Sequence, residues 1–332
     1  MTNILAIESS CDETSVAVIS DGHVLSNVVA NQTIHAEYGG VVPELASRSH
    51  QENIVPVTQV ALNRAEMDLK NIHGIGVTAG PGLLGALLVG VSYAKSLAYG
   101  LQIPLIEVNH MQAHILAHFA EDPKPKFPFL CLTVSGGHTQ LVVVRDYFIM
   151  DIIGQTLDDA VGEAFDKAGK IFGLGYPAGP MIDKKSKLGK PSISFPEPQI
   201  ADLNFSFSGI KTAVLYHIQN QRKSDPAYVE KNIDDLCASL QYTLVNVLMK
   251  KLMKASKVTG IQDIAIAGGV SANSGLREAL IENGKKYNWN IYIPKFEYCT
   301  DNAAMIGIAA YYKFLKGEFA DLSLSPSARL SF

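Results

Sequence analysis

The sequence predicts an α/β protein with two domains, and three observations support this prediction. Short apolar runs alternate with longer helical segments, as in a sheet that helices cover. A pair of apolar runs around a polar turn occurs twice, over residues 4–19 and again over residues 129–144. The 332 residues exceed what one hydrophobic core usually serves. We therefore expect a structural duplication, in which the two halves share a pattern and little residue identity.

Apolar periodicity and turn residues predict the elements of the first half. The apolar runs 4–7 and 16–19 flank a polar turn, which predicts a β-hairpin. Glycines interrupt the uncharged run 74–94, so it predicts a strand, a turn and a helix instead of a membrane span. Those glycines would let another helix approach closely, which favours a buried helix over a partner surface. The expected elements are a helix over 44–64 interrupted near Pro56, a strand over 72–77, a helix over 83–99 and a strand over 103–108.

Residues 122–128 contain three prolines, which cannot continue a helix or a central strand. We expect this segment to link the two domains. The first domain would span residues 1–127, with a helix over 303–325 packing back on it, and the second would span residues 128–302.

The second half repeats the alternation of strands and helices. A glycine-rich bend over 173–180 precedes four lysines, at positions 184, 185, 187 and 190. Such a run is usually a solvated face, but a glycine bend beside it could hold phosphate. The expected elements are the hairpin 129–144, helices over 157–172, 233–257 and 274–286, a strand over 264–267, and a last helix with Asp301 or Thr300 as its N-cap.

Two histidines four residues apart suggest half of a metal site. Asn109 is a good N-cap, so His110 and His114 would share one face of a helix and could bind one divalent ion. Such a pair is about equally often a plain feature of a helix surface, and a third ligand must come from elsewhere. The zinc-protease pattern requires glutamate directly after the first histidine, where this chain has Met111, which argues against a metalloprotease.

Composition limits the classes of partner and compartment. A net charge of −4 argues against a broadly basic surface that binds nucleic acid. A polyanion would have to bind to a local basic patch or to another subunit. The four cysteines are far apart and form no C-x-x-C pair, so we expect reduced thiols and a cytoplasmic protein. Acidic residues follow the N-terminus almost at once, so no signal peptide is expected.

The predicted elements are the parts of an actin-like ATPase fold. They are the two hairpins, the segment 264–286 with its strand, Gly-Gly turn and helix, and a last helix of small residues. In that fold two related domains hold a nucleotide in the cleft between them. Seven sequence motifs resemble those of one family, the tRNA threonylcarbamoyladenosine-forming proteins that include bacterial TsaD. The resemblance extends from about residue 4 to residue 325. The motifs are Glu8–Ser15, Thr78–Gly82, Asn109–His114, Val134–Thr139, Phe205–Ala213, Ala267–Asn273 and Asp301–Ala303.

The resemblance implies a metal site and an adenylate site. His110, His114 and Asp301 would hold one ion, Fe²⁺ in preference to Zn²⁺, and His118 is not implied as a ligand. Asp12, with Glu13 beside it, is a candidate to serve the acceptor amine or to support the metal ligands. Glycines in a turn admit phosphate near backbone N–H groups, and aspartates can accept hydrogen bonds from ribose hydroxyls. The implied adenylate-binding residues are Val134, Ser135, Gly136, Gly137, His138, Asp166, Gly179, Asp183 and Asn273.

By resemblance, the protein transfers the threonylcarbamoyl group of threonylcarbamoyl-AMP to the N6 amine of the adenosine beside the anticodon, in tRNAs that read codons beginning with A. A TsaC-like enzyme would supply the adenylate, and a TsaB-like paralogous subunit and a TsaE-like ATPase would be partners. The helix over 83–99 is the candidate docking surface, and lysines within 184–190 and 250–257 are candidate phosphate contacts. Two alternatives stay open: a kinase or ATPase of the same fold, which would turn over ATP without tRNA, and a non-catalytic nucleotide-binding scaffold.

Overall fold

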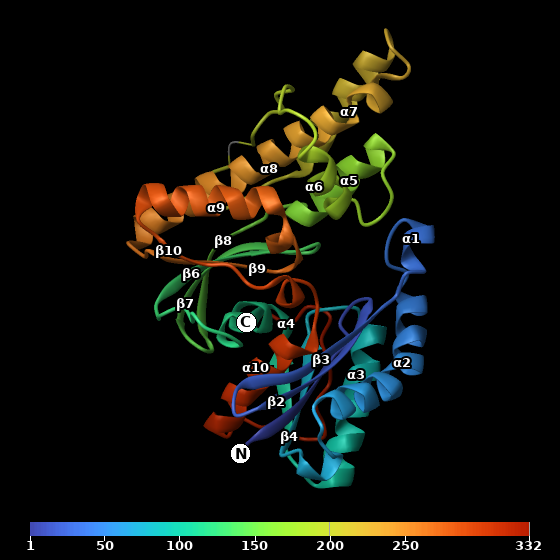
Figure 1. The fold of residues 1–332 in the computed structure, drawn as a ribbon, viewed down its shortest axis with the longest axis vertical. Coiled ribbons are helices and arrows are strands. Elements are labelled where there is room, and N and C mark those ends of the chain that lie inside the picture. The colour runs from blue at the N-terminus through green and yellow to red at the C-terminus, as the bar shows by residue number, and fades with distance from the viewer. Residues whose placement is uncertain (199, 332) are drawn as a thin grey trace. The chain divides into compact units, whose positions relative to one another are not determined.

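The structure is a computed structural model that describes residues 1–198 and 200–331 (Figure 1). The chain divides into two compact units. The first comprises Met1–Lys124 and Pro294–Phe332, and the second comprises Pro125–Ile293. The first unit is therefore built from both ends of the chain.

A mixed five-stranded sheet forms the centre of the first unit. Its strands are β1 (Asn3–Glu8), β2 (Glu13–Ser20), β3 (His23–Asn31), β4 (Gly74–Gly80) and β5 (Leu105–Asn109). The strand order is β3-β2-β1-β4-β5. β1, β2 and β3 pair antiparallel, so the predicted N-terminal hairpin is confirmed and gains a third strand. β4 and β5 extend the sheet in parallel on the other side of β1.

The second unit contains a sheet of the same design. Its strands are β6 (Phe129–Val134), β7 (Thr139–Asp146), β8 (Ile149–Gln155), β9 (Asp263–Ala267) and β10 (Asn290–Tyr292), in the order β10-β9-β6-β7-β8. β6, β7 and β8 pair antiparallel, whereas β9 and β10 run parallel to β6. Each sheet thus joins an antiparallel meander to two parallel strands, which confirms the predicted duplication and the α/β class.

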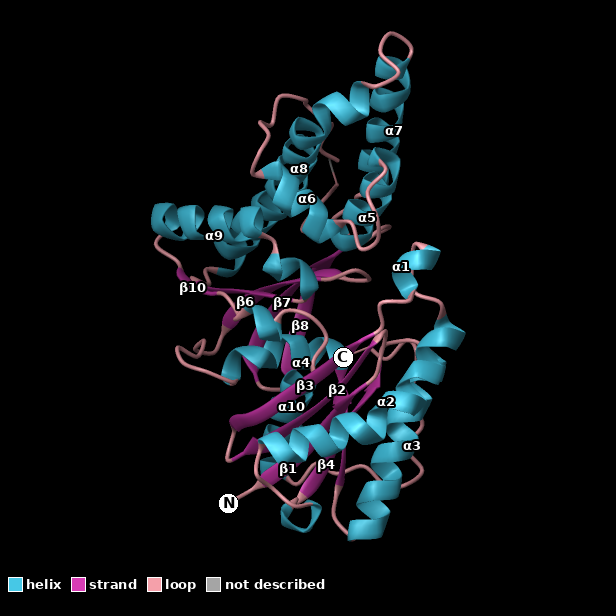
Figure 2. Cartoon of the chain, turned by 45° about the vertical axis from the view of Figure 1, so that its right-hand side comes forward, coloured by secondary structure: helices cyan, strands magenta, loops and turns pink. Residues whose placement is uncertain are grey.

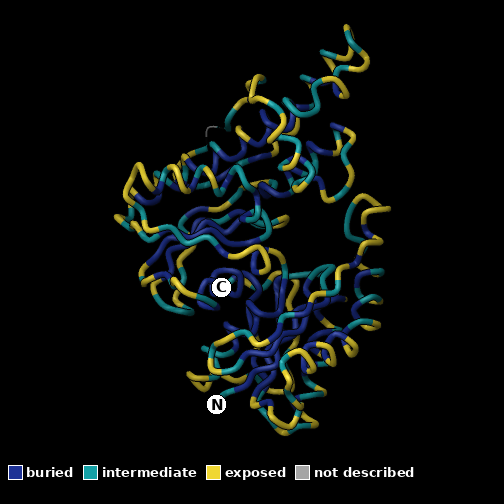
Figure 3. The backbone as a smooth tube through the Cα atoms, in the orientation of Figure 1, coloured by how far each residue is buried: buried dark blue, intermediate teal, exposed yellow. Residues whose placement is uncertain are grey.

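Helices cover both faces of the first sheet (Figure 2). Leu5 and Ile7 of β1 belong to a core cluster that includes residues of α2 and α3, while Gly307 of α10 lies against the other face. A Cβ at Gly307 would lie 2.3 Å from Ile19, so α10 can pack on the strands only with glycine there. β1, β2 and β4 in the middle of the sheet are accordingly almost wholly buried, whereas the edge strand β3 is largely exposed or half-buried (Figure 3). The helices of this unit are α1 (His35–Tyr38), α2 (Pro43–Arg64), α3 (Leu84–Leu101), α4 (His110–Leu116) and α10 (Ala303–Lys316).

Three local predictions in this unit are wrong. The last helix, expected over 303–325, ends at Lys316, where Gly317 takes the left-handed conformation. α2 continues through Pro56 without the expected interruption. The buried residues Ile54 and Val57 on either side of the proline hold the helix against the sheet, and this packing outweighs the loss of one backbone hydrogen bond. The N-cap of α10 is Asn302, whose side chain accepts from Met305 N at 3.1 Å, and not Asp301 or Thr300. The carboxylate of Asp301 is therefore left for another role.

By length and composition, α3 is a helix that could span a membrane. Its buried stripe includes Leu87, Gly90 and Val91, and a Cβ at Gly90 would lie 2.2 Å from the Ser9 hydroxyl. The glycine thus brings α3 close to the end of β1, as its small residues predict.

The second unit has its own hydrophobic core between β6, β7 and the helices around them. The motif Phe205–Ala213 contributes Phe205 and Phe207 to this core. Both side chains are fully buried, and their rings stack with centroids 6.0 Å apart. Asp158 accepts from Phe207 N at 2.8 Å and from the Ser208 hydroxyl at 2.7 Å, so it fixes the start of α7. The helices of this unit are α5 (Val161–Phe172), α6 (Gly179–Ser186), α7 (Ser208–Arg222), α8 (Tyr228–Thr259) and α9 (Ser274–Tyr287).

Candidate functional site

The end of β5 and the start of α4 place two imidazoles side by side in the first unit. The Asn109 side chain accepts from Met111 N at 2.9 Å and Gln112 N at 3.2 Å, which confirms the predicted N-cap. One turn of helix separates His110 from His114, and their ring centroids lie 4.7 Å apart. Both rings are buried, so neither histidine is a plain surface residue.

A carboxylate from the far end of the chain completes the cluster. Asp301 Oδ1 lies 3.1 Å from His114 Nε2 and 3.4 Å from His110 Nε2. Ligand atoms of the three residues all fall within 4.8 Å of one another. Two imidazole nitrogens and one carboxylate oxygen form a donor set that both Zn²⁺ and Fe²⁺ accept, with positions left open for another ligand. The arrangement therefore fits a divalent metal ion. His118 is buried nearby in sequence but is not part of the donor groups found among the described residues.

The charges in this cluster support one another. Burial opposes ionisation of both partners, yet the carboxylates of Asp301 and Glu8 raise the pKa of His110 well above its ordinary value. His110 and His114 in turn lower the pKa of Asp301 against the effect of burial. Without a metal, the proton on His110 offsets the charge of the carboxylates; a bound cation would take over that role.

Glu8 is a functional candidate that sequence reasoning did not single out. It is the last residue of β1 and is fully buried. Its Oε2 accepts from the Thr78 hydroxyl at 2.7 Å and lies 3.0 Å from His110 Nδ1, and its Oε1 accepts from Ser10 N at 2.5 Å. A carboxylate directly after a wholly apolar strand was the available signal, because a buried anion needs specific partners.

The contact with Glu8 fixes the tautomer of His110. An ionised carboxylate only accepts, so Nδ1 of His110 carries the hydrogen and Nε2 presents its lone pair on the side of Asp301 when the ring is neutral. His114 differs, because its Nδ1 is buried with no hydrogen-bond partner among the described residues. Glu8 therefore fixes the orientation of the His110 ring, whereas His114 depends on its contact with Asp301.

The turn after β1 adds further acidic groups. Burial, and then the charge of Asp301, raises the pKa of Glu13 to about 9, and a hydrogen bond with Asp12 contributes. Glu13 is thus protonated at neutral pH in the metal-free protein. Asp12 is half-buried at the same turn and shares a hydrogen bond with Glu13, on which the charge of Asp301 also acts.

These shifts predict how the stability of the metal-free protein depends on pH. The raised pKa of His110 gives stability that is fully present below 6.5 and is lost as the pH rises through the raised value. Glu13, raised from 4.5 to about 9, changes stability in the same direction. Glu8 and Asp301 have lowered pKa values and act only below 4.5 and 3.8. Chelator-treated protein should therefore melt at a lower temperature at pH 9 than at pH 6.5. Glu13→Gln should reduce that difference, and a melting temperature that rose with pH would contradict the assignment.

The glycine turn between β6 and β7 lies in the second unit. Ser135 N donates to His138 O at 2.8 Å, and His138 N donates to the Ser135 hydroxyl at 3.0 Å. A Cβ at Gly136 or Gly137 would meet nothing within 4 Å, so the backbone of this turn is open to a ligand. Gly162 N donates to Ser135 O at 3.3 Å, which brings the N-terminal turn of α5 to the same place. Helix N-termini and glycine turns both present N–H groups that suit phosphate.

The other predicted adenylate residues link α5 to the start of α6, and α6 to the start of α9. Asp166 of α5 accepts from Ala178 N at 2.8 Å, next to Gly179 at the start of α6. Asp183 of α6 accepts from the backbone N at 3.1 Å and the hydroxyl at 2.7 Å of Ser274, at the start of α9. Asn273 caps α9 through Leu276 N at 3.0 Å. The structure brings these residues together, but each carboxylate or amide already has a protein partner.

The close approach of β9 to β6 explains the Gly-Gly pair. Gly268 has a φ of +85°, and a Cβ there would lie 2.4 Å from Val134 O. Only glycine fits such a backbone conformation at that distance. Gly268 is therefore required by packing, whereas a Cβ at Gly269 would meet nothing within 4 Å.

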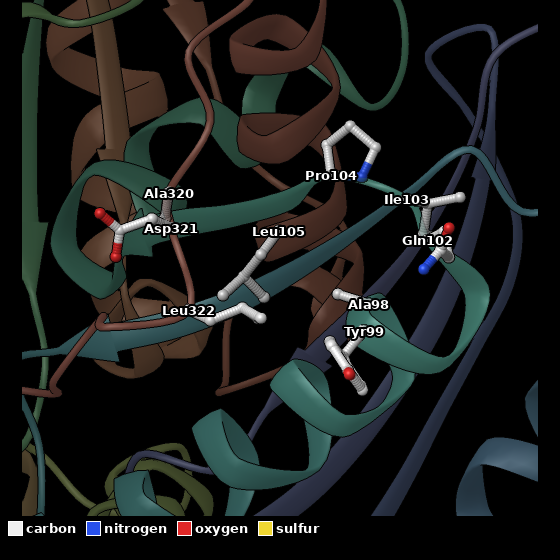
Figure 4. A pocket seen from close by; sticks show the side chains of 9 residues that line it. All are labelled: Ala98, Tyr99, Gln102, Ile103, Pro104, Leu105, Ala320, Asp321 and Leu322. Carbon is white, nitrogen blue, oxygen red and sulfur yellow. The ribbon is translucent and has the colours of Figure 1, made fainter.

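A separate hollow of about 470 Å³ lies at the C-terminal end of α3 (Figure 4). Figure 4 shows Leu105 and Leu322 facing one another between Tyr99 and Asp321. The lining is mainly apolar, and the Asp321 carboxylate already accepts a hydrogen bond from Ser323 N at 2.7 Å. This hollow offers no group of titratable side chains, so it is a weaker candidate for chemistry than the two sites above.

Comparison with known proteins identifies close relatives. A sequence model of the family described as "tRNA N6-adenosine threonylcarbamoyltransferase" (TsaD) matches residues 23–308. The chain is 61% identical over 334 residues to a protein of that description from Christiangramia forsetii, covering 99% of this chain and 98% of the relative. It is 63% identical over 330 residues to one from Riemerella anatipestifer, covering 98% and 97% of the two chains.

Solved structures of more distant proteins share the fold. Full-length HypF in a phosphate- and nucleotide-bound form superposes with a TM-score of 0.63 at 16% identity, covering 96% of this chain and 47% of that one. Component A of (R)-2-hydroxyglutaryl-CoA dehydratase from Acidaminococcus fermentans gives 0.54 at 14% identity, covering 94% and 99%. These similarities confirm the predicted actin-like ATPase fold and concern the fold alone.

Proposed function

The chain belongs to the tRNA N6-adenosine threonylcarbamoyltransferase family and is a transferase that forms threonylcarbamoyladenosine in tRNA, and we propose that it does so with a metal ion held by His110, His114 and Asp301. The N6 nitrogen of the adenosine beside the anticodon forms a bond to the carbamoyl carbon of threonylcarbamoyl-AMP. The bond from that carbon to the phosphate oxygen breaks, AMP leaves, and the amine loses a proton. The convergence of the three donor atoms is the observation that carries the proposal.

The metal would be Fe²⁺, with Zn²⁺ as the alternative that metal analysis would distinguish. Two histidines and one carboxylate that leave positions open are typical of non-haem Fe²⁺ sites, and Zn²⁺ accepts the same donors. When bound, the ion would act as a Lewis acid toward the carbamoyl oxygen. Glu8 holds the proton on Nδ1 of His110, so that Nε2 is free to bind. Asp12 is our candidate to accept the proton from the amine, since it lies at the turn beside this cluster.

The adenylate would bind in the second unit. The open glycine turn at Gly136 and Gly137 would hold the leaving phosphate together with the start of α5. Ribose hydroxyls would donate to Asp166 and Asp183, which requires these carboxylates to share or exchange the partners they have in the ligand-free protein. The full set comprises Val134, Ser135, Gly136, Gly137, His138, Asp166, Gly179, Asp183 and Asn273.

The decisive experiment is nucleoside analysis of tRNA after incubation with the purified protein, its presumed partners, threonine, bicarbonate and ATP. Threonylcarbamoyladenosine should form with the wild type and with His118→Gln, and not with His110→Ala. His118 is a matched control because it lies on the same segment and is buried, but is outside the donor cluster. Formation of the nucleoside by His110→Ala would refute the metal site. Turnover of ATP by this chain alone without tRNA would instead indicate a kinase or ATPase, which its family does not favour.

Several partners belong to the same proposal. A TsaC-like enzyme would supply the adenylate, and a TsaB-like subunit and a TsaE-like ATPase would assemble with this chain in the cytoplasm. The exposed side chains of Leu84 and Leu88 on α3 support the candidate docking surface there.

The lysines after the glycine-rich bend give a testable tRNA contact. Lys185 lies 3.3 Å from Asp234, so reversing its charge would also disturb that pair, whereas Lys184 is exposed. Lys184→Glu should weaken tRNA binding and reduce the salt dependence of log K by about 0.9, the value of one phosphate contact on a duplex. A filter-binding titration at several salt concentrations measures both quantities, and an unchanged slope would remove Lys184 from the interface.

A further inference from the structure

A second hollow, of about 660 Å³, lies in the second unit where α8 and α9 both end. The last two turns of α8 contribute Met253, Lys254 and Lys257. Tyr287, the last residue of α9, and Trp289, in the connection to β10, also line the hollow. The two connections are neighbours because β9 and β10 pair in parallel from their first residues. Figure 1 shows α9 and β10 beside one another at this edge of the sheet.

Two aromatic rings form a firm wall of the hollow. The ring centroids of Tyr287 and Trp289 lie 5.4 Å apart with an angle of 30° between the planes. Trp289 packs against the core of the unit, and its backbone N donates to Gly284 O at 2.9 Å. Tyr287 is 41% exposed, so a face of the pair remains open to a ligand. Such a rigid aromatic surface suits a flat ring better than a flexible chain.

The rim of the hollow is positively charged. Lys254 and Lys257 line it, Lys285 and Lys286 follow along α9, and no carboxylate is among the lining residues. None of these four lysines takes part in an ion pair among the described residues, and Lys286 Nζ lies 5.2 Å from the centre of the Tyr287 ring. Lys254 donates to Asp202 O at 3.1 Å, a carbonyl that leaves its charge in place.

The positive charge of the four lysines is larger than the negative charge of the two helix C-termini beside them. Each helix C-terminus carries roughly half a negative charge, so the ends of α8 and α9 together account for about one of the four positive charges. The nearby carboxylate of Asp263 accepts from the neutral Tyr292 hydroxyl at 2.8 Å and keeps its negative charge. With that charge also subtracted, the four lysines still leave a net positive charge beside the open aromatic face.

We propose that this hollow binds an unpaired nucleotide of the tRNA substrate, with its base stacked on Tyr287 and Trp289 and its phosphates beside Lys257 and Lys286. The inference rests on the proposed function, which makes tRNA the substrate. Stacking on aromatic side chains next to cationic groups is how proteins bind single-stranded RNA. A membrane surface would instead favour apolar side chains that protrude, whereas this site is concave.

The hollow is distinct from the proposed phosphate site. β9 begins beside the hollow at Asp263 and ends at Ala267, before the Gly-Gly pair. Five residues at about 3.3 Å each separate the two by roughly 17 Å. Loss of the contact should therefore raise the KM for tRNA and leave kcat unchanged.

Trp289 is the single tryptophan of the chain, so its fluorescence reports on this site directly. Titration with unmodified tRNA or a single-stranded oligoribonucleotide should quench it, whereas heparin and phosphatidylserine vesicles should not. Lys257→Glu with Lys286→Glu should weaken RNA binding about tenfold and lower the salt slope by about 1.4, since each phosphate contact on a single strand contributes about 0.7. Tyr287→Ala should weaken binding at least about fivefold, and Tyr287→Phe should retain it.

The controls separate this proposal from its alternatives. Lys223→Glu reverses an exposed lysine at the end of α7, far along the chain from the hollow, and should leave the quenching unchanged. Absence of quenching by RNA, or equal quenching by heparin or vesicles, would overturn the nucleotide site. If the wild type forms no threonylcarbamoyladenosine but RNA still quenches Trp289, the site stands and the proposed function fails. If the nucleoside forms without quenching, the proposed function stands and the site fails.

Discussion

Asp301→Asn is expected to lower the rate of threonylcarbamoyl transfer by about a hundred- to a thousand-fold, because loss of the ion would remove the group that stabilises charge on the carbamoyl oxygen, and losing one such group usually costs this much. Asp301 supplies the one anionic donor of the metal-binding cluster and lies within 3.4 Å of both imidazoles. Asparagine keeps the shape but offers a neutral oxygen, so the affinity for a divalent ion should fall as well. The measurement combines nucleoside analysis with metal content determined on the same preparation.

The control for this variant must separate metal loss from unfolding. Asn302, and not Asp301, caps α10, so the helix should remain intact when the carboxylate is removed. A melting temperature near that of the chelator-treated wild type would show that the fold is retained. Full activity with a normal metal content would exclude Asp301 as a ligand, and full activity without bound metal would exclude the metal from the reaction.

Local patterns predicted the parts of this site that depend on neighbours in sequence. The spacing of His110 and His114 and the Asn109 cap follow from helix geometry, and the structure has both. Asp301 was different, because the local sequence suggested only that it could cap α10, a role that Asn302 has in the structure. The resemblance to a family assigned it to the metal, and the side chain of Asn302 explains why it is free to serve there.

The strands that were missed have little pattern of their own. β3 and β8 are hairpin strands at the edge of each meander, and their mixed polar sequences lack a clear alternation. β10 is three residues long and exists because it pairs with β9. Such elements depend on a partner strand, which a local reading of the sequence does not contain.

Glu8 shows the same limit within the site itself. Its contact with His110 joins residues that are 102 positions apart, and Thr78 comes from a third strand end. β1, β4 and β5 are consecutive parallel strands of the sheet, so their C-terminal ends lie at one edge and bring Glu8, Thr78 and His110 together. The sequence signalled only that a carboxylate follows a buried strand.

Glu8→Gln is expected to weaken metal binding by about ten- to a hundred-fold, as is usual when a residue that orients a histidine ligand is changed. The backbone N of Ser10 can only donate, so it should hold the amide oxygen of the new side chain on the Oε1 side. The amide NH₂ would then face Thr78, whose hydroxyl can rotate to accept, and Nδ1 of His110. That nitrogen would have to accept, and the proton of the neutral ring would move to Nε2, 3.4 Å from Asp301 Oδ1.

The variant thus keeps the volume and the contacts of Glu8 while it reverses two hydrogen bonds, those with Thr78 and His110. A metal titration of the purified protein measures the loss directly, without reference to activity. Thr78→Val is the matched control, because it removes a hydroxyl bonded to the same Oε2 but leaves His110 Nδ1 a carboxylate to donate to. Thr78→Val should bind metal within a few-fold of the wild type. If both variants bound metal equally well, Glu8 would be a buried structural carboxylate, and the orientation of His110 would have to come from the fold of α4 alone.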